Sequence, residues 1–154
     1  MNIFSYFRKA GIDTVDTSFY QKINEWISWY NSNVRGFSFY KAYTGRGKYN
    51  RCRRKSMAMA KKLSEDIADL LLNEKVMITL EDDATQKFVQ EILDENHFLV
   101  IGNDFQERKA YTGTVAYIPY LYDTEVSEDG SVLSGKIGIE YVDAPNIFPV
   151  TWKN

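Results

Sequence analysis

The fold of this chain is decided by the stretch MAMAKKLSEDIADLLLNE, residues 57–74. Its apolar residues recur three and four positions apart, and neither Gly nor Pro interrupts them. The pattern predicts one long amphipathic helix from Arg51 to Glu74. The stripe expected to be buried consists of Met59, Ala60, Leu63, Ile67, Leu70 and Leu71.

A second amphipathic helix is predicted before this stretch, over residues 17–30. Its apolar positions, such as Phe19, Ile23 and Tyr30, keep the same spacing, and Asp16 or Thr17 can serve as its N-cap. Residues 31–50 are rich in Asn, Ser, Gly and Tyr. They predict a loop with a short extended piece.

After the long helix the sequence predicts a short strand over residues 75–80 and then a further helix. Asp82 or Asp83 can cap that helix, and Asn96 is expected to end it. The side chains expected to point inward are Phe88, Val89, Ile92 and Leu93. Residues 97–110 are ambiguous, because Gly102 disfavours a helix there, and helix is favoured for their second half.

β-Branched and aromatic residues dominate after residue 112. Residues 115–122 and 137–142 flank an acidic turn region around Asp129 and Gly130, which predicts an antiparallel hairpin. Pro119 is expected to interrupt the pairing or to confine it to an edge. Helices first and strands later indicate an α+β fold, and we expect residues 1–154 to form a single domain.

Charge is distributed unevenly along the 154 residues. Residues 1–62 carry thirteen Lys and Arg against three Asp and Glu, whereas residues 63–154 carry six against eighteen, giving +10 and −12. Such asymmetry suits either contact with nucleic acid or complementary faces that meet between copies of one protein. The longest apolar stretch is too short to span a membrane, and the N-terminus lacks the pattern of a secretory signal, so we expect synthesis in the cytoplasm.

Residues suited to catalysis or metal binding are few. His97 and Cys52 are the only residues of their types and lie far apart, so we expect no metal or cofactor site and no enzymatic activity. A carboxylate-dependent nuclease would need the acidic run 81–83 to converge with Glu140 or Asp143. Helix capping is the favoured role for that run.

The most informative local feature is the basic stretch of residues 46–62, which holds eight Lys and Arg and no acid. Tyr43 precedes it and Tyr49 lies within it. Interleaved cations and aromatic rings can bind phosphates and stack on bases; alternatively, the cations can pair with acidic surfaces of a neighbouring copy. The candidate contact residues are Arg46, Lys48, Arg51, Arg53, Arg54 and Lys55.

Several segments, taken in order, carry a family resemblance. They are EWISWY at 25–30, YNRCRRKS at 49–56, MAMAKKLSEDIADLLLNEKV at 57–76, GTVA at 113–116 and IEYVDAPNIFPVTW at 139–152. This combination resembles the portal, or minor capsid, family of tailed phages that infect Gram-positive hosts. Members of that family are longer and continue into stem, clip and crown segments, so the resemblance implies that this chain is an N-terminal, wing-like part of a portal subunit.

The resemblance also implies a function and a set of partners. The intact protein would form a ring of identical subunits at one vertex of the virion, through which DNA is packaged and ejected. The expected partners are the terminase, head-to-tail adaptor proteins, capsid or scaffolding protein and DNA in transit, with no membrane. The alternative from a different class is a small nucleic-acid-binding module that uses residues 46–62.

Overall fold

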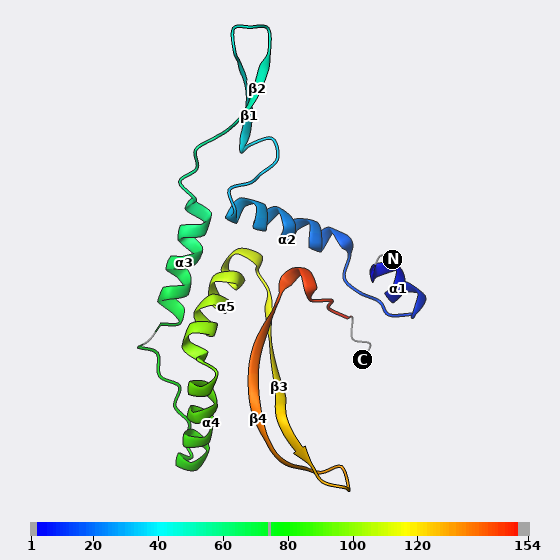
Figure 1. Ribbon diagram of the computed structural model, residues 1–154, viewed down its shortest axis with the longest axis vertical. Helices are drawn as coiled ribbons and strands as arrows, with labels where there is room; N and C mark the ends of the chain where they lie inside the picture. The colour runs from blue at the N-terminus through cyan, green and yellow to red at the C-terminus, as the bar shows by residue number, and fades with distance from the viewer. Residues whose placement is uncertain (1–2, 74, 151–154) are drawn as a thin grey trace.

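The computed structural model describes residues 3–73 and 75–150 as an elongated arrangement of helices with two projecting β-hairpins (Figure 1). Glu74 and Trp152, at the ends of the predicted long helix and of the family resemblance, lie outside these residues. The helices are α1 (Ile3–Lys9), α2 (Thr17–Tyr30), α3 (Met59–Leu71), α4 (Asp83–Glu95) and α5 (Phe98–Thr112), followed late in the chain by the 3-10 turn η1 (Ala144–Asn146). The hairpins are β1 (Phe39–Tyr43) with β2 (Tyr49–Arg53), and β3 (Val115–Val126) with β4 (Val132–Asp143).

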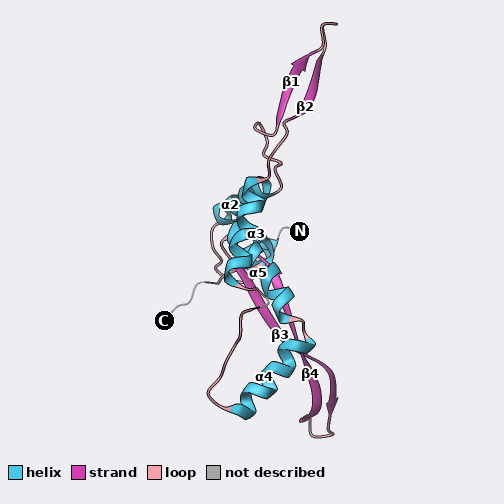
Figure 2. Cartoon of the chain, turned by 90° about the vertical axis from the view of Figure 1, so that its left-hand side faces the viewer, coloured by secondary structure: helices cyan, strands magenta, loops and turns pink. Residues whose placement is uncertain are grey.

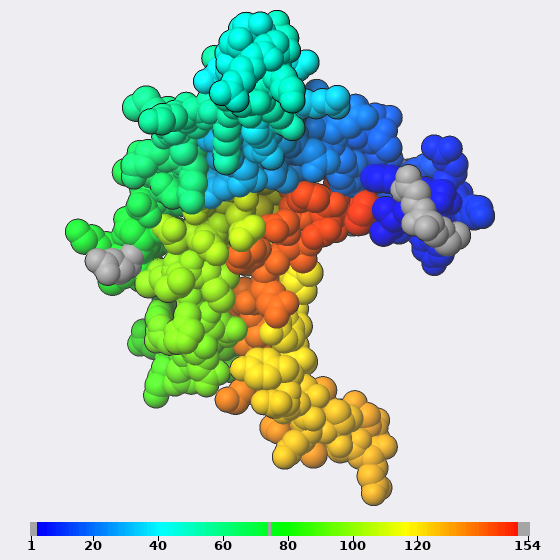
Figure 3. Space-filling model, turned by 45° about the horizontal axis from the view of Figure 1, so that its top comes forward, coloured from blue at the N-terminus to red at the C-terminus, as the bar shows by residue number. Residues whose placement is uncertain are grey.

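The α+β prediction is confirmed, and the hairpins project toward opposite ends of the molecule (Figure 2). Helices α3 and α5 pack together below α2, and β3 and β4 run down beside α5 and α4 (Figure 1). The outline is concave between α1 and the tip of the β3–β4 hairpin (Figure 3).

Helices α2 and α4 begin and end where their local signals predict. The Asp16 carboxylate accepts a hydrogen bond from the Ser18 backbone N–H at 2.7 Å, and the Asp82 carboxylate accepts one from the Thr85 N–H at 2.7 Å. These bonds satisfy free N–H groups at the helix starts, and the bond from Ser18 lowers the pKa of Asp16. The Thr85 hydroxyl, which donates to Asp82 at 2.6 Å, and then the Thr85 N–H lower the pKa of Asp82. Asn96 ends α4 as predicted.

The start of the long helix was predicted wrongly. Residues 51–53 belong to β2, and α3 begins only at Met59, after Ala58 adopts a left-handed φ of 50°. Strand pairing with β1 extends the backbone of these residues, so the basic stretch lies mostly on a hairpin rather than at a helix start.

The stripe expected to be buried on α3 was also predicted wrongly. Leu63 and Leu70 are 61% and 81% exposed, whereas the buried residues are Ser64 and Ala68. Small side chains on this face let α3 approach α5, where a Cβ placed on Gly102 would lie 2.1 Å from Leu72 Cδ2. Of the other residues in the predicted stripe, Met59, Ala60 and Leu71 are exposed and Ile67 is half-buried.

Residues 75–80 form no strand, contrary to the prediction. Their backbone has no strand partner among the described residues; instead the Gln86 side-chain amide accepts from Leu80 N–H at 2.6 Å and donates to Ile78 C=O at 3.0 Å. On α4, Phe88 is 58% exposed, although Val89, Ile92 and Leu93 are half-buried.

Helix α5 includes the ambiguous segment except for His97, its N-cap residue. It extends through Gly102, and Gly113 ends it with a left-handed φ of 77°. Phe105 on this helix stacks on Tyr117 of β3, with ring centroids 3.8 Å apart and nearly parallel planes. This contact joins the helical part of the chain to the β3–β4 hairpin.

The predicted C-terminal hairpin is confirmed and is longer than expected. Pro119 lies opposite Ile139 within the ladder, which a two-stranded sheet tolerates because both strands are edge strands. The pairing shifts register instead between Tyr122 and Glu125.

The buried centre of the molecule is small. Ile23, Ala68 and Ala144 are fully buried, and an aromatic cluster of Phe4, Tyr20 and Phe148 closes the end near α1. The accessible surface is 12268 Å², whereas a compact monomer of 17.9 kDa exposes about 8,000 Å². Within the described residues, no helix is long and apolar enough to cross a membrane.

Candidate functional site

The β1–β2 hairpin presents a face on which cations lie among aromatic rings. Side chains two apart on a strand share a face, and so do residues directly opposite each other in an antiparallel pair. The register pairs Phe39 with Arg53, Lys41 with Arg51 and Tyr43 with Tyr49. These six residues form one face, which we call the basic-aromatic face.

Contacts between side chains agree with this assignment. The Arg51 guanidinium lies 3.9 Å from the centroid of the Phe39 ring, diagonally across the two strands. The Tyr43 and Tyr49 rings lie 5.4 Å apart near the turn. The opposite face carries Tyr40 and the half-buried Cys52, which therefore points away from its neighbours in sequence Arg51 and Arg53.

A tight turn joins the two strands. The Thr44 backbone N–H and hydroxyl both donate to the Lys48 C=O, at 3.0 and 2.9 Å, while Gly45 and Gly47 have φ values of +74° and +72°. Arg46 and Lys48 lie in this turn and are exposed. Their charges therefore lie at the far end of the projecting hairpin (Figure 2).

The basic stretch divides into two parts according to its partners. Within residues 3–73 and 75–150, no Asp or Glu oxygen lies within 4.0 Å of the charged groups of the six candidate contact residues between Arg46 and Lys55. By contrast, Lys61 and Lys62 on α3 pair with Glu65 and Asp66 one turn later, at 3.8 and 2.9 Å. The hydrogen bond with Asp66 raises the pKa of Lys62.

A recess lies at the base of the hairpin, where β2 leads toward α3. Its volume is about 650 Å³, and four cations line it without any carboxylate. The Ser32 and Ser56 hydroxyls also line it and are hydrogen-bonded to each other at 2.8 Å. The lining cations are Arg53, Arg54, Lys55 and Lys61.

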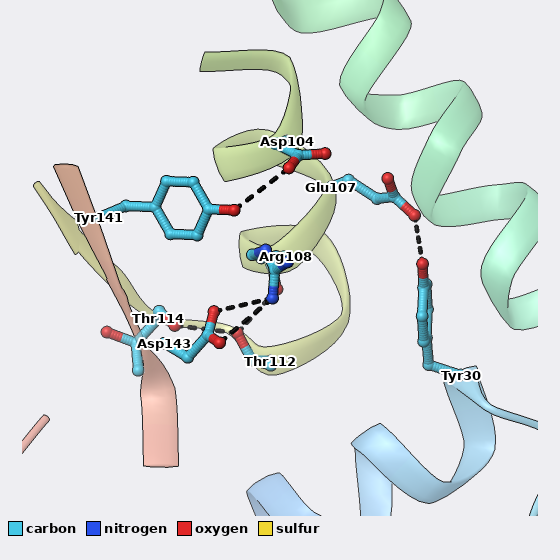
Figure 4. A network of polar contacts seen from close by, with 8 residues as sticks. All are labelled: Tyr30, Asp104, Glu107, Arg108, Thr112, Thr114, Tyr141 and Asp143. Carbon is cyan, nitrogen blue, oxygen red and sulfur yellow. Dashed lines mark hydrogen bonds and ion pairs between the residues drawn. The ribbon is translucent and has the colours of Figure 1, made fainter. Parts of the chain in front are cut away.

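Tyr30, which lines this recess, belongs to a network of polar contacts (Figure 4). Tyr30, the last residue of α2, donates its hydroxyl proton to Glu107 of α5 and stacks its ring on Tyr111, with centroids 4.0 Å apart. Burial and the bond to Glu107 raise the pKa of Tyr30, so its hydroxyl stays protonated. The Lys61 ammonium lies 5.9 Å from the Tyr30 ring centroid, on the recess side.

The same network connects α5 to the β3–β4 hairpin (Figure 4). Arg108 Nη1 donates to both carboxylate oxygens of Asp143, at 3.0 and 3.2 Å, and the Tyr141 hydroxyl donates to Asp104 at 3.1 Å. Burial would lower the pKa of Arg108, but the opposing charge of Asp143 raises it overall. These groups are engaged with each other, so the network has the contacts of a structural joint.

Other residues considered for chemistry do not converge. Asp82 caps α4, Glu140 accepts from Tyr120, and no group of three or more His, Cys, Asp or Glu that could hold a metal ion occurs among the described residues. The nuclease hypothesis therefore lacks its carboxylate cluster. His97 occupies the N-cap position of α5 with φ of 50° but makes no side-chain capping bond, and it lines an apolar groove of about 530 Å³ beside residues 76–79.

Sequence reasoning found most cations of this site but missed two members of the basic-aromatic face, one of them a cation. Lys41 and Phe39 belong to the basic-aromatic face through pairing with β2. The signal was available, because cations and aromatic residues occupy every second position on both sides of a turn rich in Gly. Reading the following residues as a helix start hid that alternation.

Comparison with known protein families gives a match over most of the chain. The family model for phage portal proteins of the SPP1 Gp6-like type matches residues 11–154. The chain belongs to this portal protein family. The predicted membership of the portal family is thereby confirmed, whereas a Gram-positive host stays a prediction. The match covers the basic hairpin, the α3–α5 pair and the β3–β4 hairpin of the portal-family chain. Neither the curated proteins nor the solved structures contain a match.

Proposed function

We propose that this portal-family chain is a structural component of the phage portal vertex, forming part of the ring through which DNA is packaged and ejected. The observation that carries the proposal is the family match over residues 11–154. In this proposal the chain is a wing-like part of a portal subunit, residues 1–154 form one domain, and its role is non-enzymatic. It is made in the host cytoplasm and ends in the virion.

The surface of the chain supports a place inside an assembly. Its accessible area exceeds that of a compact monomer by roughly half. Large apolar side chains such as Met57, Leu70 and Met77 are more than 80% exposed. A closed ring brings two different faces of each subunit together, and such contacts would cover these side chains.

The proposed partners follow from family membership. They are further copies of the same subunit, the terminase, head-to-tail adaptor proteins, capsid or scaffolding protein and the DNA in transit. The basic hairpin and the acidic tip of the β3–β4 hairpin lie at opposite ends of the chain (Figure 2). Each end therefore offers a different charge to its partner.

Detection of the chain in purified particles tests the proposal. DNA-filled particles from the phage or lysogen that encodes the chain would be separated from free protein and probed with an antibody against it. The expected result is a fixed amount per particle, far below that of the major capsid protein. Particles that contain DNA but lack the chain would contradict the proposal.

A second candidate function is a small nucleic-acid-binding module that uses the basic stretch 46–62. The observation that favours it is the exposure of Arg46, Lys48, Arg51, Arg53, Arg54 and Lys55 without a carboxylate partner among the described residues. Light scattering of the chain at low and moderate salt, with and without duplex DNA, tests it. A complex with DNA that dissociates as salt rises is expected, and a mass unchanged by DNA would contradict it.

A further inference from the structure

We infer that the basic-aromatic face and the recess at its base form one continuous track that binds the phosphodiester backbone of a nucleic acid. The inference deepens the second candidate function and does not require ring formation. It assigns the contact to one side of one hairpin. It also excludes Lys62, which the basic stretch includes by sequence but which does not line the recess and is paired with Asp66 at 2.9 Å. Lys61 is included because it lines the recess, with Glu65 at the longer distance of 3.8 Å.

The arrangement of charge along the hairpin is the first argument. Arg53 belongs both to the basic-aromatic face and to the recess, so it joins the two. Lys41 and Arg51 lie directly opposite each other and form the next pair on the same face toward the turn. Arg46 and Lys48 occupy the turn itself. Positive charge therefore follows one side of the hairpin from its tip to its base.

The recess is the second argument, because its lining suits a phosphate group. Four cations and two hydroxyls surround about 650 Å³, and no carboxylate lines it. Lys and Arg neutralise phosphates, and serine hydroxyls are frequent donors to phosphate oxygens. The Tyr30 ring stacked on Tyr111 gives this recess a fixed floor.

The aromatic residues favour nucleic acid over an acidic protein surface. Tyr43 and Tyr49 are 62% and 67% exposed, at the end of a hairpin that projects from the body. Exposed rings beside cations give bases a surface for stacking, which a run of carboxylates does not need. The competing ligand for the basic-aromatic face is an acidic face of a second copy of the chain, and the experiment below distinguishes the two.

The experiment measures binding of fluorescein-labelled DNA of about 30 nucleotides, single-stranded and duplex, by anisotropy from about 50 to 200 mM salt. The test variant is Lys41→Gln/Arg51→Gln/Arg53→Gln. Its control, Arg8→Gln/Lys9→Gln/Lys22→Gln, removes the same charge from α1 and α2. The test variant is expected to lose at least about tenfold in affinity, with a salt slope lower by about 2.7 on duplex or about 2 on single strands.

A second variant keeps the test decisive if loss of the Arg51 contact with Phe39 disturbs the hairpin. The variant Arg46→Gln/Lys48→Gln changes two side chains of the turn. Neither side chain has a hydrogen bond or an ion pair among the described residues. It should lose several-fold in affinity with an unchanged far-ultraviolet spectrum. The variant Tyr43→Leu/Tyr49→Leu distinguishes single-stranded from duplex DNA as the ligand. If it loses about tenfold in affinity for single strands alone, the ligand is single-stranded. If only the cation variants lose affinity, the ligand is duplex.

The remaining outcomes overturn the inference. If the α1–α2 control loses as much affinity as the hairpin variants, binding follows net charge and no track exists. If poly-glutamate displaces DNA at equal charge, an acidic protein surface is the ligand. If the unmodified chain binds neither single-stranded nor duplex DNA, the second candidate function fails together with this inference. If the chain binds DNA but the hairpin variants bind it equally well, only this inference is contradicted.

Discussion

The Arg51 guanidinium lies 3.9 Å from the centroid of the Phe39 ring and thereby links β2 to β1 across one face of the hairpin. A free two-stranded hairpin is marginally stable, so each cross-strand contact counts. A cation–π contact at an exposed site contributes about 0.5–1 kcal/mol. This pair therefore helps to hold the basic-aromatic face in shape.

Phe39→Leu is expected to loosen the hairpin without affecting the body of the molecule. Backbone amides of residues 39–53 should exchange with solvent about two- to fivefold faster. This factor corresponds to the loss of about 0.5–1 kcal/mol from the cation–π contact. Hydrogen–deuterium exchange followed by mass spectrometry measures this, with α5 as the internal reference. Exchange rates equal to those of the unmodified chain would contradict the role given to the pair.

Gly102 is expected to resist substitution even though it lies inside a helix. Alanine normally stabilises a helix interior relative to glycine by about 1 kcal/mol. Here the new Cβ would lie 2.1 Å from Leu72 Cδ2, so α3 and α5 must move apart or Leu72 must change rotamer. Gly102→Ala should lower the free energy of unfolding by about 1–3 kcal/mol in urea.

A matched glycine gives the control for that prediction. Gly36→Ala places a Cβ where no atom lies within 4 Å, although its φ of +84° adds strain. Its destabilisation should therefore be smaller and confined to the loop before β1. A stabilised Gly102→Ala variant would show that the close contact between α3 and α5 does not require a glycine.

Arg108 and Asp143 are expected to be energetically coupled. Removing the charge in Arg108→Met leaves Asp143 without its two hydrogen bonds and should cost about 1 kcal/mol, because the side chains are 34% and 42% exposed and solvent screens the pair. The double variant Arg108→Met/Asp143→Asn should be less destabilised than the sum of the single variants. Urea unfolding of all four proteins measures this coupling, and strictly additive losses would contradict it.

Asp129 should make the tip of the β3–β4 hairpin sensitive to acid. Hydrogen bonds from Ser127 and Ser131 lower its pKa from 3.8 to about 2. The pKa of Asp129 is lower in the folded chain than in the unfolded chain. The ionised carboxylate therefore stabilises the hairpin tip fully above about pH 4, and this stabilisation is lost as the pH falls toward 2. The Ser131 amide resonance should titrate with a midpoint near pH 2, and Asp129→Asn should abolish that titration.

The parts of the fold that were predicted correctly depend on local signals. Asp16 and Asp82 mark the starts of α2 and α4 because a cap interacts with the next two or three residues. The start of α3 could not be placed this way, because residues 51–53 are extended by pairing with β1 rather than by their own preferences. The buried face of α3, with Ser64 and Ala68, is likewise set by packing against α5, which lies far along the chain.

The candidate site shows the same division. The six cations from Arg46 to Lys55 are recognisable in the sequence as a run of charge. Their grouping into a face depends on strand register, and their grouping into a recess depends on the position of residues 53–56 beside Ser32. Residues 75–80 show the opposite case. Their apolar and β-branched residues are typical of a strand, yet the described chain provides no partner strand for them.

Immunogold labelling of intact particles tests the portal assignment most directly. DNA-filled particles from the phage or lysogen that encodes the chain would be opened gently and labelled with an antibody against it. Our account predicts gold at a single vertex of each capsid, the one that carries the tail. Label spread over many vertices, or label found only on free protein, would contradict it.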